Sequence, residues 1–187
     1  MRKLIYGMGV SLDGFVAAPG DDISWSTPSE ELHWYHNETV SPDGLSLYGR
    51  RLWEVMSQYW PTADQAPEVE EVEADFARRW RARPKVVFSS TVTEVDWNTT
   101  LHRGDPVAEI RRLKAEDGGD MDIGGARLAA AATAAGLVDE FRLFYNPVAL
   151  GGGAPFFHAL GNWLELRLLE TRVFEGGTVL MRYELRR

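Results

Sequence analysis

The chain has no cysteine among its 187 residues, and this absence removes several kinds of chemistry. Disulfide bonds, thiolate zinc sites and a thiol nucleophile are all excluded. An excess of basic residues is also missing, because 20 Lys and Arg face 28 Asp and Glu and give a net charge of −8. This charge disfavours general binding to nucleic acid or to an anionic membrane. The lack of cysteine is compatible with a reducing compartment, so we expect a cytoplasmic protein.

Long apolar segments are scarce as well. Leu128–Val138 is mostly alanine and has about half the length that a membrane-spanning helix needs. The apolar run Leu4–Val10 near the basic N-terminus is short and is soon interrupted by Asp13-Gly14, so we interpret it as a first strand rather than a signal peptide. With 44% hydrophobic residues and no visible repeat or linker, residues 1–187 are expected to form one domain.

Strand-like and helix-like segments alternate along most of the chain. The predicted strands are Leu4–Ser11, Leu45–Tyr48, Lys85–Ser89, Met121–Ile123 and Glu140–Tyr145. The predicted helices are Pro28–Val40, Arg50–Tyr59, one that ends near Arg83, Pro106–Lys114 and Arg127–Ala135. The helix that ends near Arg83 has an acidic first half, Pro67–Asp75, which we expect to be solvated. Asp105 is the expected N-cap of the helix that starts at Pro106. Trp163–Phe174 and Thr178–Leu185 are predicted to form a closing hairpin. The pattern indicates an α/β fold with three α/β/α layers, a mainly parallel sheet and antiparallel C-terminal strands.

In such a sheet, ligands bind at the carboxyl ends of the strands. The segments expected there are Ser11–Gly14, Tyr48–Arg51, Ser89–Thr91 and Gly124–Arg127. Gly49 opens a helix whose first N–H groups can bind a diphosphate. Arg50 and Arg51 follow it, and cations at a helix N-terminus oppose the macrodipole, so this pair indicates an anionic partner. The hydroxyls of Ser89 and Ser90 can donate to the same phosphate-rich ligand.

Gly124-Gly125 turns the predicted strand Met121–Ile123 into an alanine-rich helix. Glycine has no Cβ, so a ligand can approach the backbone closely at such a turn. The chain has no Gly-x-Gly-x-x-Gly and no Walker lysine, so neither the Rossmann nor the P-loop fingerprint applies.

Several short segments, in the right order along the chain, carry a family resemblance. Leu47–Glu54 resembles the Gly-Arg-x-Thr-Trp-Glu segment of dihydrofolate reductases, Val87–Ser90 resembles their adenosine-side strand, and Ile123–Gly125 resembles their diphosphate turn. Leu137–Leu143 and Pro147–Phe157 are similar to the reductase domain at the C-terminus of the riboflavin-biosynthesis deaminase-reductase. The resemblance covers essentially the whole chain and implies a stand-alone member without the zinc deaminase domain. One departure is Leu52, where dihydrofolate reductases carry threonine.

The resemblance implies a dihydrofolate reductase-like fold, NADPH as cofactor and a cytoplasmic reductase. The positions it assigns to the cofactor are Gly49, Arg50 and Arg51 near the 2′-phosphate and diphosphate, Ser89 and Ser90 near the adenosine phosphate, Gly124, Gly125, Ala126, Arg127 and Leu128 under the diphosphate, and Val16 and Ala17 beside the nicotinamide. The implied substrate is a pterin- or pyrimidine-like heterocycle, such as 5-amino-6-(5-phosphoribosylamino)uracil. Another small substrate, or a protein that binds a nucleotide without catalysis, are the alternatives.

Trp25–Tyr35 resembles the segment that holds the substrate-binding acid of dihydrofolate reductases. Alignment on Pro28 selects Glu30, whereas alignment on the Trp-Tyr pair selects Glu31. Thr27 as N-cap and Glu30 at the third helical position form a predicted capping box, which gives Glu30 a structural role.

The capping box leaves Glu31 as the expected catalytic and substrate-binding acid. Tyr35 lies four residues later on the same helix face and can stack on a heterocycle. Asp13 is a second candidate acid, although Asp-Gly after a strand also fits a turn. His33 and His36 lack an evident third ligand, so we interpret them as surface or core histidines and expect no metal site.

The C-terminal hairpin alternates apolar side chains with Arg and Glu. A hairpin at the edge of a sheet has to cover its apolar face, either with helices of the same chain or with a second copy. The resemblance to dimeric riboflavin reductases favours a homodimer.

Overall fold

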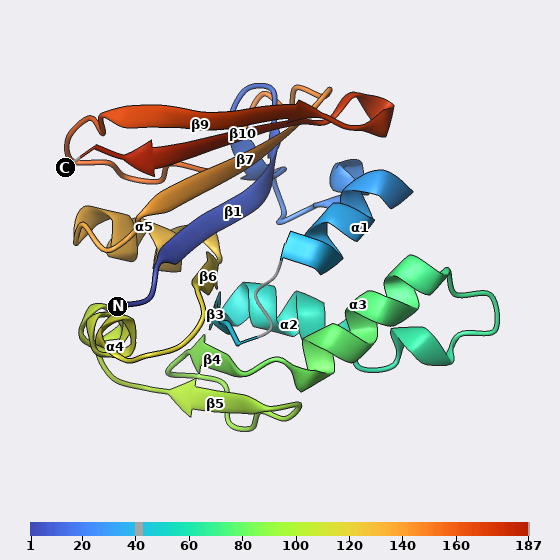
Figure 1. The fold of residues 1–187 in the computed structure, drawn as a ribbon, viewed down its shortest axis with the longest axis horizontal. Coiled ribbons are helices and arrows are strands. Elements are labelled where there is room, and N and C mark those ends of the chain that lie inside the picture. The colour runs from blue at the N-terminus through green and yellow to red at the C-terminus, as the bar shows by residue number, and fades with distance from the viewer. Residues whose placement is uncertain (40–42, 187) are drawn as a thin grey trace.

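The computed structural model describes residues 1–39 and 43–186, which contain an eight-stranded sheet in the order β5-β4-β3-β6-β1-β7-β10-β9 (Figure 1). Its strands are β1 (Leu4–Ser11), β3 (Leu45–Gly49), β4 (Lys85–Phe88), β5 (Thr99–His102), β6 (Met121–Gly124), β7 (Glu140–Asn146), β9 (Leu166–Val173) and β10 (Val179–Leu185). The first six are parallel, while β10 runs antiparallel to both β7 and β9. A separate small sheet pairs β2 (Phe15–Ala17) with β8 (Ala154–Pro155).

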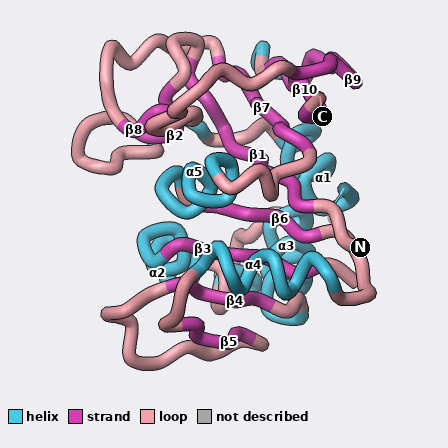
Figure 2. The backbone as a smooth tube through the Cα atoms, turned by 90° about the vertical axis from the view of Figure 1, so that its left-hand side faces the viewer, coloured by secondary structure: helices cyan, strands magenta, loops and turns pink. Residues whose placement is uncertain are grey.

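Helices cover both faces of the large sheet (Figures 1 and 2). One face carries α1 (Glu30–Thr39), α2 (Arg50–Tyr59) and α3 (Glu71–Ala82), and the other carries α4 (Pro106–Ala115) and α5 (Ala126–Ala134). Short 3₁₀ turns are η1 (Ser24–Ser26), η2 (Ala63–Gln65) and η3 (Glu175–Gly177). Within the described residues, no helix is long and apolar enough to cross a bilayer. The predicted three-layer α/β/α architecture is confirmed.

Side-chain alternation along the strands divides the core into two parts. Leu4, Tyr6 and Val10 of β1 belong to the large core under α4 and α5, which includes the buried Ile110 and Ala129. The opposite face has smaller apolar clusters, so it is less completely filled.

One of these smaller clusters is aromatic. Trp53 of α2 and Trp80 of α3 stack with ring centroids 5.7 Å apart over Tyr48 and Val87 of the sheet. This cluster fixes α2 and α3 beside the ends of β3 and β4.

Most predicted elements are found within one or two residues of their expected bounds. Leu4–Ser11 and Arg50–Tyr59 match, and the side chain of Asp105 caps α4 by accepting a hydrogen bond from the Val107 N–H at 2.9 Å. The predicted end of the first helix at Val40 lies outside the described residues. The sequence analysis missed β2, β5 and β8, because these strands are short and, as in the segment Thr99–His102, carry little apolar alternation.

Candidate active site

A cavity of about 1020 Å³ lies on the face of the sheet that carries α1, α2 and α3. Its floor includes Ile5, Gly7 and Gly9, alternate residues of β1 that point to this face. In the sheet, Gly7 pairs with Arg142 and Gly9 pairs with Phe144, and both of these β7 residues also line the cavity. Two positions of the central strand without side chains therefore leave room beside the sheet.

Helix α1 forms one wall of the cavity. The residue at which the helix begins determines the surroundings of Glu30 and Glu31. The Ser29 hydroxyl accepts a hydrogen bond from the Leu32 N–H at 3.3 Å, so Ser29 is the N-cap. The Thr27 hydroxyl instead donates to the Ser24 carbonyl oxygen at 3.5 Å. The predicted capping box of Thr27 and Glu30 is therefore wrong, because the helix begins two residues later than its proline suggests.

With this start, the neighbouring residues Glu30 and Glu31 of α1 have different surroundings. Glu30 lines the cavity. The Glu31 carboxylate accepts hydrogen bonds from the Arg172 guanidinium at 2.8 Å and from the Glu175 N–H at 2.9 Å. The Arg172 hydrogen bond, followed by that from Glu175, lowers the pKa of Glu31. Glu31 thus bonds α1 to the end of β9 and to η3, whereas the sequence analysis had expected Glu30 to have the structural role, as part of a capping box.

Tyr35 lies beside Arg172, the same residue that Glu31 contacts. Its ring centroid lies 5.2 Å from that of Phe174 and 6.1 Å from that of Phe144, and the Arg172 guanidinium carbon lies 5.2 Å from the ring centre. Tyr35 does not appear among the residues that line the cavity. We expected Glu31 and Tyr35 to face a substrate together. In the structure both instead contact Arg172, and neither lines the cavity.

His33 is buried and His36 is half-buried, in agreement with their interpretation as core histidines, and both also line the cavity. Burial, aided by the nearby charges of His33 and Arg142, lowers the pKa of His36 to about 4, so its imidazole is neutral at pH 7. Its ring centroid lies 4.6 Å from that of Phe144. In the parts of the chain that the structure describes, no three His, Asp or Glu side chains form a metal-binding group.

Asp13 lies outside the cavity lining and organises a turn. Its carboxylate accepts hydrogen bonds from the Ser11 hydroxyl at 2.7 Å, the Leu150 N–H at 3.0 Å and the Gly151 N–H at 2.7 Å. These bonds, that from Leu150 foremost, lower the pKa of Asp13 to about 2. Asp13 therefore joins the turn after β1 to the loop after β7, which favours the turn interpretation that its sequence left open.

The turns expected to hold the cofactor come together at one edge of the sheet. β4, β3 and β6 are neighbours, and their carboxyl ends carry Ser89, Gly49 and Gly124 respectively. Gly125 has a φ of +98°, and a Cβ built on it would lie 3.5 Å from the Gly49 backbone nitrogen. A Cβ on Gly124 would overlap the side chain of Leu52. The two glycines therefore allow α2 and α5 to begin side by side.

The first turn of α5 presents backbone donors at this edge. Its first helical hydrogen bond runs from the Ala129 N–H to the Gly125 carbonyl oxygen at 3.0 Å. The N–H groups of Ala126, Arg127 and Leu128 precede that bond and have no acceptor within the helix. The Leu128 side chain is buried in the core, so only its backbone is available to a ligand.

The predicted phosphate-side residues on α2 and after β4 have partners in the chain. Arg50 pairs with Glu54 at 2.8 Å and Arg51 pairs with Asp21 at 2.7 Å, and all four side chains are exposed. Exposed pairs of this kind contribute little to stability and open readily. The Ser89 hydroxyl accepts hydrogen bonds from the Thr91 and Val92 N–H groups at 3.1 and 3.0 Å, and Ser90 is exposed beside it.

Val16 and Ala17, expected beside the nicotinamide, are buried in β2. Val16 packs into the large core, and Ala17 pairs with Ala154 of β8. Gly153 precedes that pair with a φ of +132°, and a Cβ on it would overlap the Ala17 carbonyl oxygen. The small β2–β8 sheet therefore depends on close backbone contact at Gly153.

Comparison with known proteins identifies the family. The model of the RibD C-terminal domain matches residues 2–180, so the chain belongs to this family. Two proteins of Bacillus subtilis (strain 168), both described as uncharacterized, are 30% identical to it: YyaP over 97% of this chain and 94% of its own, and YwjB over 97% of each.

Solved structures share the fold. A putative riboflavin biosynthesis protein from Shewanella sp. PV-4 has a TM-score of 0.74 at 23% identity, with both chains fully covered. Dihydrofolate reductase from Enterococcus faecalis has a TM-score of 0.65 at 15% identity, covering 99% of this chain and 97% of its own. A deaminase/5-amino-6-(5-phosphoribosylamino)uracil reductase from Thermotoga maritima has a TM-score of 0.64 at 17% identity, covering 99% of this chain and 57% of its own. The family resemblance and the dihydrofolate reductase-like fold are confirmed.

The bonds of Asp13 predict a pH-dependent contribution to stability. Its folded-state pKa of about 2 lies below the ordinary value near 4, so the ionised carboxylate stabilises the folded state above about pH 4, and this stabilisation is lost as pH falls through about 2. Asp13→Asn should lower the urea midpoint at pH 7 and 5, and its difference from the wild type should shrink at pH 3 and 2. The exposed Asp117→Asn is the control. Equal midpoints at pH 7 for Asp13→Asn and the wild type would contradict this role.

Gly153→Ala should lower the free energy of unfolding by roughly 1–3 kcal/mol, since a side chain there meets both a positive φ and the Ala17 carbonyl oxygen. Gly152→Ala is the matched control, because a Cβ on Gly152 has no other atom within 4 Å. Urea unfolding of the two variants measures the difference. The idea fails when both substitutions have the same effect.

Proposed function

We propose that this protein is an NADPH-dependent reductase that transfers a hydride to a pterin- or pyrimidine-like heterocycle bound in the cavity. The observation that carries the proposal is the meeting of the glycine turns at Gly49 and Gly125, on the same sheet as a cavity that Glu30 lines. Membership in the RibD C-terminal domain family supports a reductase. The Enterococcus faecalis structure of the same fold is a complex with NADP(H), which supports the choice of cofactor.

The proposed cofactor residues supply two helix starts and two cations. The N–H groups at the starts of α2 and α5 suit a diphosphate, because helix N-termini attract anions. Arg50 and Arg51 can leave their exposed partners for the 2′-phosphate of NADPH, while Ser89 and Ser90 lie at the neighbouring strand end. Bound NADPH would supply the hydride, and the protein groups would position it.

Glu30 is the proposed acid, in place of Glu31. Reduction of an imine requires a proton at nitrogen as the hydride reaches carbon, and a carboxyl group in a partly apolar cavity suits that step. Glu30 lines the cavity, with the Trp34 indole N–H donating to it at 3.4 Å. Its carboxyl group can bond to the heterocycle and pass it a proton, while Glu31 keeps the helix that carries Glu30 in place.

One candidate substrate is 5-amino-6-(5-phosphoribosylamino)uracil. The name of the Thermotoga maritima protein describes it as a reductase of this compound. A different small heterocycle on the same fold is the alternative substrate. A protein that binds a nucleotide without catalysis is the alternative function, and it predicts cofactor binding with no turnover on any acceptor.

Glu30→Gln should lower turnover on any accepted heterocycle by roughly 10²-fold or more, because removal of a general acid has effects of this size. Its affinity for NADPH should stay within about twofold of the wild type, as the cofactor lies elsewhere. Glu31→Gln is the control: it should lower the melting temperature while leaving turnover largely intact. Steady-state assays and thermal melts separate the two, and the opposite pattern would return the catalytic role to Glu31.

NADPH should bind more tightly than NADH, because a charged contact to the extra phosphate contributes about 1.5–3 kcal/mol. Substitution of Arg50 or Arg51 by Ala should reduce this preference by about tenfold in calorimetry. Arg112→Ala is the matched control, because Arg112 is also exposed and pairs with a glutamate, Glu116, four residues later. Equal dissociation constants for the two cofactors in the wild type would refute the assignment.

The exposed outer strand β9 supports a homodimer. Val173 and Leu168 of β9 are 69% and 51% exposed, and Trp163 just before it is 87% exposed. Exposed large apolar side chains at a sheet edge are a feature of surfaces that a second copy covers. A two-fold contact would place the same patch on both subunits.

Light scattering at micromolar concentration should give the mass of a dimer. Leu168→Asp should convert it to a monomer or make it poorly soluble. Leu12→Asp is the control, because Leu12 is 71% exposed in the turn after β1, a strand that β7 and β10 separate from β9. A wild-type monomer would rule out this assembly.

A further inference from the structure

We propose that the cavity binds an elongated substrate along α1, and that Arg142 and His36 hold an anionic group of this substrate, a phosphate or a carboxylate. This inference rests on the proposed function, because it concerns the substrate of the same cavity. We call the part of the cavity that Arg142 and His36 line the anion pocket. Glu30, which would meet the heterocycle, lies nearer the start of α1 than His36 does.

The residues of α1 that line the cavity are all polar. Glu30, His33, His36 and Thr39 follow one another at intervals of three residues, and each lines the cavity. Residues at this spacing are neighbours on the helix surface. The side of a helix that faces a sheet is usually apolar, because it forms part of the core. Core packing therefore does not account for this polar stripe, whereas a wall that contacts a ligand requires such groups.

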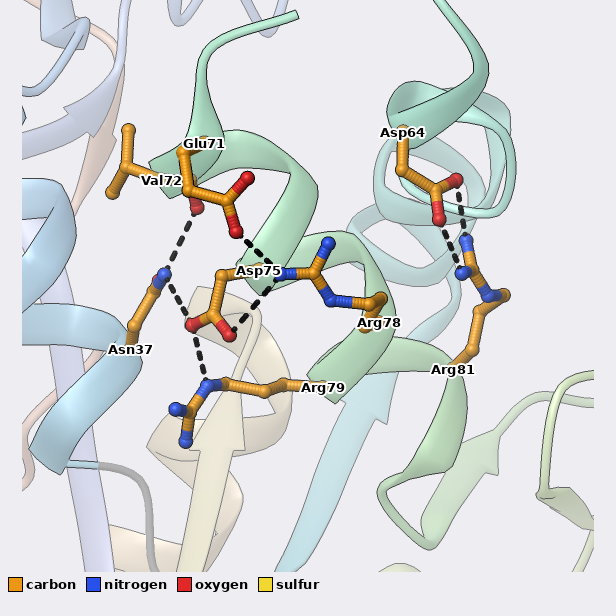
Figure 3. Close-up of polar contacts among 8 residues, drawn as sticks. All are labelled: Asn37, Asp64, Glu71, Val72, Asp75, Arg78, Arg79 and Arg81. Atoms are coloured by element: carbon orange, nitrogen blue, oxygen red, sulfur yellow. Dashed lines mark hydrogen bonds and ion pairs between the residues drawn. The ribbon is translucent and has the colours of Figure 1, made fainter.

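Contacts on other sides of α1 fix the direction of the polar stripe. The Asn37 side chain donates to the Val72 carbonyl oxygen at 2.9 Å and to the Asp75 carboxylate at 3.0 Å (Figure 3). Glu31 accepts the hydrogen bond from Arg172 of β9 at 2.8 Å. Neither Asn37 nor Glu31 lines the cavity. The helix is thus held by residues that leave the stripe available to a ligand.

The spacing along α1 indicates how long this ligand is. His36 follows Glu30 by six residues, which corresponds to about 9 Å along the helix axis at 1.5 Å per residue. A cavity of about 1020 Å³ has room for several linked groups. A heterocycle that bonds to Glu30 can therefore carry a substituent that ends beside His36. A phosphoribosyl chain is one substituent of this kind.

Arg142 of β7 retains hydrogen-bond donors for a ligand. Its Nε–H donates to Glu140 Oε1 at 2.6 Å, and the same oxygen accepts a hydrogen bond from Arg182 at 3.0 Å. Arg182 has a second acid, Glu170, at 2.6 Å. Within the described residues, the Nη groups of Arg142 make no hydrogen bond, and Glu140 is its only ion-pair partner. A guanidinium with available N–H groups suits bidentate binding of a phosphate or a carboxylate.

The other arginines around the cavity are paired with acids of their own. Arg83 also lines the cavity, but it bonds to Asp122 and to the Ser46 hydroxyl. The arginines of α3 do not line the cavity, and their partners are Glu71 for Arg78, Asp75 for Arg79 and Asp64 for Arg81 (Figure 3). Of the cations that line the described cavity, Arg142 is therefore the one suited to bind an added anion.

His36 adds a second polar group to the anion pocket. Its ring centroid lies 4.6 Å from that of Phe144, and no hydrogen bond to its ring nitrogens is found among the described residues. Burial, followed by His33 and Arg142, lowers the pKa of His36 to about 4. The imidazole is therefore neutral at pH 7, and its N–H can donate a hydrogen bond to an anion.

The glutamates at the start of α3 act on a different part of the cavity. Burial lowers the pKa of His33, and Glu73 and Glu70 oppose this effect. Neither glutamate is among the groups that shift the pKa of His36. An anion in the anion pocket therefore meets a cation and a neutral donor rather than a carboxylate.

Three probes of similar size test the anion pocket: phenyl phosphate, benzoate and benzyl alcohol. NMR titration at low ionic strength should show at least one of the two anions binding about tenfold more tightly than benzyl alcohol and shifting the ring signals of His36. His102 and His158 do not line the cavity, so their ring signals are the internal reference. The tighter of the two anions identifies the group that the pocket prefers, a phosphate or a carboxylate.

Arg142→Gln should weaken binding of this anion by about tenfold, because it removes the charged donor. Arg182→Gln is the matched control: Arg182 bonds to the same Glu140 oxygen but does not line the cavity, so anion affinity should stay close to that of the wild type. His36→Phe keeps a ring beside Phe144 and should weaken the anion by about threefold. It replaces Arg142→Gln when that variant does not fold. The affinity for benzyl alcohol should be the same in all variants.

Binding of both anions no tighter than that of benzyl alcohol would overturn the proposal. Anion affinity that Arg142→Gln and His36→Phe leave unchanged would do the same, and loss of that affinity in Arg50→Ala instead would assign the anion to the cofactor edge. NADPH titrated into the same samples separates the two proposals. Anion binding that depends on Arg142 without NADPH binding refutes the reductase alone, and NADPH binding without such anion binding refutes the anion pocket alone.

Discussion

The close backbone approach of Gly49 and Gly125 is the constraint on which the candidate site depends. β3 and β6 are adjacent parallel strands, so the helices that follow them begin at the same edge and compete for space. A side chain at Gly125 would need a strained backbone and would crowd the Gly49 nitrogen. Because neither position carries a side chain, the N-termini of α2 and α5 lie close enough to bind one anion together. The cofactor proposal depends on this geometry.

The second determinant is the open face of β1. Gly7 and Gly9 have no side chains to fill the space beside the sheet, and residues of α1 line the same cavity. The helix is fastened from the outside by Glu31 and from below by Asn37, which donates to the Val72 carbonyl oxygen at 2.9 Å. The cavity thus forms because contacts of Glu31 and Asn37 hold α1 in place, while Gly7 and Gly9 below it have no side chains to fill the space.

The sequence predicted the architecture well because buried alternation and helix caps are local signals, as Leu4–Ser11 and Asp105 illustrate. The topology of parallel sheets also led us to expect the turns after β3, β4 and β6 at one edge, where the structure has them. The prediction from the sequence failed at α1, where Thr27, Pro28 and Glu30 match a capping box but the Ser29 hydroxyl makes the cap.

The adjacency of Glu30 and Glu31 has a consequence for how such a protein can change over time. Consecutive residues of a helix point about 100° apart, so two neighbouring positions experience different surroundings. Glu31 bonds to the hairpin through Arg172 and the Glu175 N–H, and Glu30 lines the cavity. Replacement of Glu30 therefore leaves the contacts that hold α1 intact, whereas replacement of Glu31 removes its hydrogen bonds to Arg172 and to the Glu175 N–H. The residue that holds α1 in place, Glu31, and the residue that lines the cavity, Glu30, can therefore change independently in evolution, although they are neighbours in one helical turn.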